Sequence, residues 1–394
     1  MRHALFRATR AAVAAALLAS ASAAGWPAVA VAAPVSLPGV VTQLAAGQPC
    51  ATGSPRTAQA QPWSRRAMGL PRAWQLSQGA GVTVAVVDTG VGTGIPALAG
   101  RVRTVGDADR DCVGHGSFAA GLIAAAPGDG TGVAGVAPQA RILAVRDTDE
   151  RGAVTAAGVA RGIREAVDAG ADVVYVAHAL FTGRQELTTA VAYATRGDVL
   201  VVAPAAPDTA PTDPRTGRPD PTARPCFPAF VPQVLSVVDY GPGDSRPQNA
   251  PFPFAPDLAA PGDAVVSVGP RGAGHYVGSG SSLAAAHAAG AAALVRARYP
   301  RLPAAEVARR LTGWAYPASV PKLDPYGAVS AVLPVRQDPL PDPVPAQLPR
   351  PGSDRPRVRA LAVAGGAGAV VLLMAAAAVV VPRGRARAWR PAGR

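Results

Sequence analysis

VTVAVVDTG, at residues 82–90, is a run of β-branched and small apolar residues that ends at a carboxylate and a turn. Similar runs occupy residues 140–145 (ARILAV), 171–176 (ADVVYV) and 198–202 (DVLVV), and helical patterns fill residues 156–169 and 186–195. Apolar strands that alternate with helices predict an α/β fold, with a mostly parallel twisted sheet and helices on both faces. Functional side chains gather at the carboxyl ends of such strands, and Asp88 lies at one of these ends.

A second stretch, GHGSFAAGLIA at residues 114–124, places His115 between two glycines and ahead of a small, apolar helical run. Glycines let other backbone approach the imidazole closely. Histidine is suited to acid–base work near neutral pH, but a structural turn histidine would look the same. This segment alone therefore leaves both readings open.

A third stretch, GSGSSLAAAHAAG at residues 278–290, is a Gly/Ser turn that leads into a helix of small residues. Ser282 falls near the expected helix start, where free backbone N–H groups favour a developing negative charge. A serine at this place is also a common helix cap, so it does not identify a nucleophile by itself.

The three segments together form a more specific pattern. A serine nucleophile needs a base, and the base needs an orienting carboxylate. Their order along the chain, and the motifs around Asp88, His115 and Ser282, resemble the subtilisin family of serine proteases over residues 60–330. The resemblance implies a subtilisin-like fold in which Asp88 orients, His115 is the base and Ser282 is the nucleophile that cleaves peptide bonds of a protein or peptide substrate.

Features outside the motifs resemble one branch of that family, the mycosins, which are membrane-anchored subtilases of type VII secretion systems. These features are an extension before the domain, a cysteine shortly before His115, a proline-rich linker and an apolar C-terminal segment. The resemblance implies a partner, the type VII secretion membrane complex, and an extension that wraps the domain.

The three cysteines suit an exported protein. The mycosin resemblance implies a Cys50–Cys112 disulfide that clamps the extension beside the site, whereas three free thiols are the alternative. Cys226 is then left over, and we expect it to be free and buried.

Two segments depart from the subtilase pattern. Subtilases carry an asparagine after the strand at residues 199–202, and its amide donates a hydrogen bond to the oxyanion of the tetrahedral intermediate. Alignment places Pro207 there, and proline has no such donor. The segment YVAHA at residues 175–179 replaces the usual Asn-x-Ser-Leu-Gly, and we expect His178 in a structural role rather than in the cleft.

The chain ends decide the location. Residues 1–33 carry three Arg and no acid, and residues 350–394 carry nine Arg and one Asp, so these ends hold eleven of the thirteen net positive charges. This distribution is typical of export and membrane anchoring, and it argues against nucleic-acid binding. We expect a single-pass cell-membrane protein with an extracytoplasmic protease domain. The predicted segments are a signal peptide (1–33), an N-terminal extension (34–80), a protease domain (81–333), a Pro-rich linker (334–357), a transmembrane helix (358–381) and a basic cytoplasmic tail (382–394).

The sequence predicts no cofactor and no catalytic metal, because it lacks phosphate-loop, dinucleotide and zinc-ligand spacings. Asp107, Asp109 and Asp111 alternate before His115, which suits either a bound cation or a solvated acidic loop. Three functions remain as hypotheses. They are a slow or narrow serine endopeptidase with a weakened oxyanion hole, a catalytically impaired scaffold of the secretion complex, and a membrane-tethered peptide-binding module.

Overall fold

The computed structural model describes residues 36–128, 130–247, 249–331 and 355–387. The chain forms two units, residues 1–334 and residues 335–394. The predicted signal peptide (1–33) and the predicted linker up to residue 354 lie outside the described residues.

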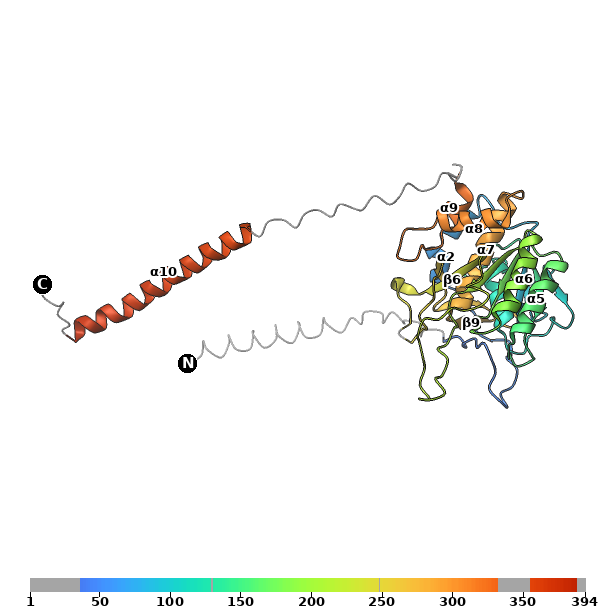
Figure 1. Cartoon of the computed structure of the whole chain (residues 1–394), viewed down its shortest axis with the longest axis horizontal. Helices are drawn as coiled ribbons and strands as arrows, with labels where there is room; N and C mark the ends of the chain where they lie inside the picture. Colours follow the sequence, from blue (N-terminus) through green and yellow to red (C-terminus); the bar gives the residue numbers. More distant parts are fainter. Residues whose placement is uncertain (1–35, 129, 248, 332–354, 388–394) are drawn as a thin grey trace, which may run out of the picture. The chain divides into compact units, whose positions relative to one another are not determined.

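A seven-stranded, fully parallel sheet forms the centre of the first unit (Figure 1). This confirms the predicted parallel sheet. Its order brings the carboxyl end of β1 next to those of β3 and β4. The strands, in spatial order, are β2 (Val102–Val105), β3 (Arg141–Arg146), β1 (Thr83–Asp88), β4 (Val173–Val176), β5 (Leu200–Pro204), β6 (Val234–Tyr240) and β7 (Leu258–Pro261).

Helices cover both faces of the sheet, as the unbroken apolar strands require (Figure 1). Side chains alternate along β1, so Val84 and Val86 enter one core while Ala85 and Val87 enter the other. The first core is shared with α4 (His115–Ala124) and α7 (Ser281–Arg298), and the second with α5 (Ala156–Asp168) and α6 (Arg184–Arg196). The subtilisin-like α/β arrangement predicted from the sequence is therefore confirmed.

Shorter elements complete the unit. Part of the predicted extension belongs to the main core, because Met68, Leu70 and Ala73 are buried in it. The remaining elements are α2 (Trp63–Ala67), α3 (Leu70–Ala73), η2 (Pro96–Leu98), η3 (Pro242–Asp244), an antiparallel pair β8 (Val265–Val268) and β9 (His275–Gly278), α8 (Ala304–Gly313) and α9 (Pro325–Ser330).

Two parts of the chain between residues 36 and 62 lie against β9. Val40 N–H donates to the Val277 carbonyl (2.9 Å), and Val277 N–H donates to the Pro38 carbonyl (2.9 Å). Further on, His275 N–H donates to the Arg56 carbonyl (2.8 Å). These backbone bonds fix the extension against the body, as expected from the mycosin resemblance.

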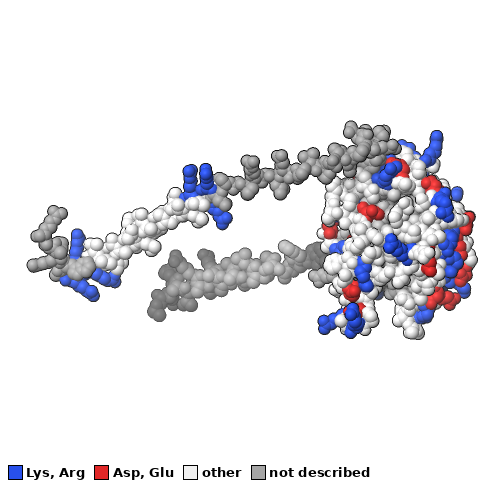
Figure 2. Space-filling view, in the orientation of Figure 1, with Lys and Arg blue, Asp and Glu red and all other residues white. Residues whose placement is uncertain are grey.

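The second unit contains one described helix, α10 (Arg355–Ala386). It is long and apolar enough to cross a membrane, and none of its apolar window is buried. Figure 2 shows Lys and Arg side chains at both of its ends and an uncharged stretch between them. The helix contains the predicted transmembrane segment.

Candidate active site

The carboxylate of Asp88 lies at the carboxyl end of β1 and is fully buried. One oxygen accepts the N–H of Thr89 (2.7 Å), and both oxygens face Nδ1 of His115 (3.0 and 2.7 Å). Burial opposes the ionised form, but the charge and hydrogen bond of His115 outweigh it and lower the pKa of Asp88. Asp88 is therefore an anion that fixes the imidazole.

His115 is the first residue of α4 and is 2% exposed. Its Nδ1–H donates to Asp88, which leaves Nε2 to face the hydroxyl of Ser282 at 3.2 Å. The neighbouring Gly116 is needed for this approach, because a Cβ there would lie 2.1 Å from the Gly90 carbonyl oxygen. The structure thus brings together the three residues expected from the sequence.

Ser282 is the second residue of α7 and is fully buried. Ser281, just before it, donates its hydroxyl hydrogen to Asp239 (2.6 Å), and Asp239 is paired with Arg246 (2.7 Å). This buried network holds the start of α7 in place. The Ser282 N–H therefore has a fixed position at a helix N-terminus.

A fourth residue, Asp208, contacts the serine directly. It follows β5, and its side chain is 8% exposed. One oxygen accepts the N–H of Ser282 (2.9 Å), and the other accepts the Ser282 hydroxyl (2.5 Å) and lies 3.7 Å from Nε2 of His115.

This contact lies one residue from the position that the sequence alignment gives to the oxyanion donor. The alignment places Pro207 at that position, and the side chain that reaches Ser282 belongs to Asp208. The turn after β5 runs through Ala205, Ala206 and Pro207, and only the folded loop determines which side chain points inward. Pro207 and Asp208 both line a pocket of about 490 Å³ beside the site.

Two carboxylates therefore flank His115. Burial disfavours the imidazolium, but Asp88 and Asp208 together raise the pKa of His115 well above its usual value of 6.5. Both neighbouring carboxylates therefore favour the imidazolium form of His115.

The predicted Cys50–Cys112 disulfide is present, with Cα atoms 4.5 Å apart. It ties the extension to the segment that precedes His115. Cys226 is free and buried, and burial raises the pKa of its thiol to about 11. The predicted disulfide is therefore confirmed, and the structure adds the state of Cys226.

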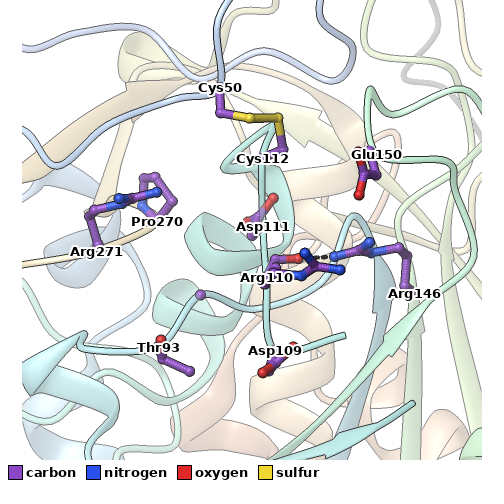
Figure 3. Close-up of a pocket in the computed structure, with 11 residues that line it drawn as sticks. Cys50, Thr93, Asp109, Arg110, Asp111, Cys112, Arg146, Glu150, Pro270 and Arg271 are labelled. Carbon is purple, nitrogen blue, oxygen red and sulfur yellow. Dashed lines mark hydrogen bonds between the residues drawn. A yellow bond between two sulfur atoms is a disulfide. The ribbon is translucent and has the colours of Figure 1, made fainter. Parts of the chain in front are cut away.

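The disulfide lies at one end of a pocket of about 410 Å³, in which the Arg146 guanidinium donates to the backbone carbonyl of Arg110 (Figure 3). Asp111, on the same wall, is buried and accepts hydrogen bonds from the Thr89 hydroxyl (2.8 Å) and the Ser117 N–H (2.8 Å). Asp111 thus joins the turn after Asp88 to the start of α4. The described residues contain no cluster of three or more His, Cys, Asp or Glu side chains that would hold a metal ion.

The altered segment at residues 175–179 contributes a second histidine–carboxylate pair. Nε2 of His178 lies 3.3 Å from Asp147, which is buried at the end of β3. Burial lowers the pKa of His178, but Asp147 outweighs burial and raises it. His178 therefore has the structural pairing that was expected. Tyr175 was not singled out as a site residue; it is fully buried, and in the described part of the chain its hydroxyl has no hydrogen-bond partner.

The sequence and the fold are similar to those of known proteins. The sequence model of the subtilase family matches residues 79–328. Mycosin-1 of Mycobacterium tuberculosis is 32% identical over 364 residues, which cover 77% of this chain and 81% of that protein. The structure of the MycP3 protease from the type VII (ESX-3) secretion system is 30% identical, covers 75% of this chain and 100% of that one, and superposes with a TM-score of 0.61.

A further solved structure, the periplasmic assembly from the ESX-5 inner membrane complex, contains a chain that is 25% identical, with a TM-score of 0.62. The match covers 81% of this chain and 97% of that one. The matched family model spans the whole sheet and all three segments around Asp88, His115 and Ser282. The chain therefore belongs to the subtilase family and is a mycosin-like, subtilisin-type serine protease.

Proposed function

We propose that this protein is a membrane-anchored, extracytoplasmic serine endopeptidase of a type VII secretion complex. The observation that carries the catalytic part is the continuous contact from Asp88 through His115 to Ser282, with distances of 2.7 and 3.2 Å. The partner is inferred from the mycosin and ESX-5 relatives.

The geometry supports acyl transfer. The Ser282 hydroxyl attacks the peptide carbonyl carbon, and Nε2 of His115 takes the hydroxyl proton. Asp88 stabilises the imidazolium that forms and keeps Nδ1 as a donor. His115 then gives the proton to the leaving amine, and water hydrolyses the acyl-serine by the same route.

The second candidate is a catalytically impaired scaffold that keeps the fold and binds the secretion complex. Asp208 is the observation that favours it, because its carboxylate accepts both the N–H and the hydroxyl of Ser282. A subtilase needs donors, not an anion, at the place where the oxyanion forms.

An activity probe separates these two candidates. The full chain in detergent is treated with a fluorophosphonate, beside Ser282→Ala and His115→Ala variants. Ser245→Ala, at an exposed serine that bonds only the Pro242 carbonyl, is the matched control. We expect labelling of the wild type and the control only. If the folded wild type takes no label at any pH from 5 to 10, the endopeptidase proposal is overturned and the scaffold remains.

The membrane orientation needs its own test. Single cysteines placed in the tail after residue 387 and in the body are treated with an impermeant maleimide on intact cells, in a Cys226→Ala background. We propose that only the body cysteine reacts, because a positively charged tail favours the cytoplasmic side. Labelling of the tail cysteine alone would show the opposite membrane orientation. Co-purification of the full chain with secretion-complex subunits tests the partner.

A further inference from the structure

Asp208 makes three contacts with the catalytic residues, and all three involve atoms that the reaction needs. Its oxygens lie 2.9 Å from the Ser282 nitrogen, 2.5 Å from the Ser282 hydroxyl oxygen and 3.7 Å from Nε2 of His115. The serine hydroxyl has one hydrogen to donate. Asp208 is the nearer acceptor, because Nε2 of His115 lies 3.2 Å from the hydroxyl oxygen.

The position of Asp208 is built into the backbone. Gly280 has a φ of +155°, and a Cβ on it would lie 2.2 Å from the Asp208 carboxyl carbon. Only a glycine therefore leaves room for this carboxylate at the start of α7. The nearby cation, Arg246, is already paired with Asp239, and the ion pair that the described residues give Asp208 is with His115.

A pocket beside Asp208 gives its side chain room to move. Asp208 lines the 490 Å³ pocket, together with Thr209, Ser279 and Gly280. The side chain can therefore shift toward this pocket when a substrate carbonyl enters, and remain beside that carbonyl.

We propose that Asp208 is a self-inhibitory residue that keeps the site at rest by occupying the Ser282 N–H and hydroxyl and pairing with the His115 imidazolium. This inference rests on the proposed peptidase function. It adds a residue that decides when that function operates.

The site leaves this resting state when one proton moves from His115 to Asp208. With the proton on His115, the imidazolium cannot accept the serine hydrogen, and the Asp208 anion repels a developing oxyanion. With the same proton on Asp208, the imidazole is neutral and the carboxylic acid donates to the oxyanion. The number of protons is the same in both states, so substrate binding shifts the population without net proton uptake.

Several titratable groups lie around this pair, and they act on His115 directly or through Asp88 and His178. Asp88 is in contact with Nδ1 and stabilises the imidazolium most directly. The other groups are His178 and Tyr175 near the end of β4, Asp147 after β3, and Asp111 ahead of α4. Since none of them contacts both Ser282 and His115 as Asp208 does, a change confined to Asp208 isolates its role.

The test compares Asp208→Asn with the wild type and with Asp168→Asn, which removes a carboxylate at the exposed end of α5. Each full chain is labelled in detergent with a fluorophosphonate at pH values from 5 to 10. We expect Asp208→Asn to label faster by a factor on the order of 10² or more, because it replaces an anion with an amide donor. The acid limb of its pH profile should also move to lower pH, since His115 loses one of the two carboxylates that raise its pKa.

A second readout does not depend on activity. The titration of His115 is followed by NMR of histidine-labelled full chain, in which His178 and His287 report that the fold is intact. Asp208→Asn should lower the pKa of His115, and Asp168→Asn should leave it unchanged. Asp208→Ser, which removes the charge with a smaller side chain, serves if the asparagine variant does not fold.

The outcomes separate this inference from the proposed function. Equal labelling rates and equal His115 titration in the wild type and the Asp208 variant would overturn the inference while the peptidase stands. A lowered His115 pKa without labelling of any variant would support the Asp208–His115 pairing and overturn the peptidase.

Discussion

Asp208 differs from an asparagine by one group, an oxygen in place of an NH₂, and that group faces the serine hydroxyl. An amide would offer a hydrogen to a developing oxyanion, whereas the carboxylate accepts the Ser282 N–H and hydroxyl hydrogen instead. We propose that this difference in chemistry decides whether the Asp88–His115–Ser282 arrangement turns over substrate.

Asp208, and not the aligned Pro207, contacts Ser282, and this gives a prediction about the two residues. Pro207→Asn leaves the Asp208 carboxylate on Ser282, so it should not raise the labelling rate by more than about threefold. Asp208→Asn should raise it on the order of 10²-fold. The two rates are measured on the same preparation with the same probe. A large gain in labelling rate from Pro207→Asn alone would show that Pro207, and not Asp208, occupies the oxyanion position.

At the scale of one element, α7 explains how the serine is delivered to the histidine. Sixteen of its eighteen residues are buried, and most of them are alanine or glycine. Small side chains let the helix lie close to its neighbours: a Cβ on Gly290 would come 2.7 Å from the Val136 Cβ. This packing fixes the N-terminus of α7, and Ser282 with it, opposite His115.

α7 also carries a buried histidine whose titration should limit stability in acid. His287 bonds the Pro261 carbonyl through Nδ1 (2.7 Å), and burial lowers its pKa to about 4. Between an unfolded pKa near 6.5 and this value, only the unfolded chain binds the proton. The stabilisation is therefore present above pH 6.5 and is lost as the pH falls toward 4. The loss is about 3 kcal/mol in the free energy of unfolding.

Denaturant unfolding of the wild type and His287→Gln, at pH 7 and pH 4.5, measures this term. The glutamine variant keeps a donor for Pro261 but cannot titrate, so its stability should fall less on acidification. The acid titration of other groups is common to both chains and cancels in the comparison. Parallel losses in the two chains would show that His287 does not set the acid limit.

On the scale of the whole molecule, the extension is joined to the body by backbone hydrogen bonds, buried side chains and a disulfide. Its backbone bonds to β9, and the Cys50–Cys112 disulfide closes a sequence separation of 62 residues. Both attachments flank the site, so the extension acts as a part of the protease unit.

Replacing Cys50 and Cys112 by alanine should lower the free energy of unfolding by about 4 kcal/mol, because the unfolded chain regains the freedom of a long loop. Cys226→Ala, at the free buried thiol, is the control and should cost about 1 kcal/mol. Urea unfolding of the full chain under non-reducing conditions measures both. A double variant as stable as the control would mean that the backbone bonds to β9 suffice to hold the extension.

Local patterns in the sequence were enough to predict β1, β3, β4 and β5, the helices α4, α5, α6 and α7, the ends at which Asp88, His115 and Ser282 lie, and the apolar C-terminal helix. Such patterns depend on neighbours within a few residues, since alternation and apolar runs determine which faces are buried. The disulfide partner was available only through the mycosin resemblance.

The tertiary structure alone decided that Asp208, and not Pro207, meets Ser282, that His178 pairs with Asp147, and that Tyr175 is buried at the end of β4. Asp208 and Ser282 are 74 residues apart, and their contact depends on how the turn after β5 and the start of α7 meet. A turn of prolines and alanines has no periodicity that shows which side chain points inward. That orientation is determined only when both elements are packed on the sheet.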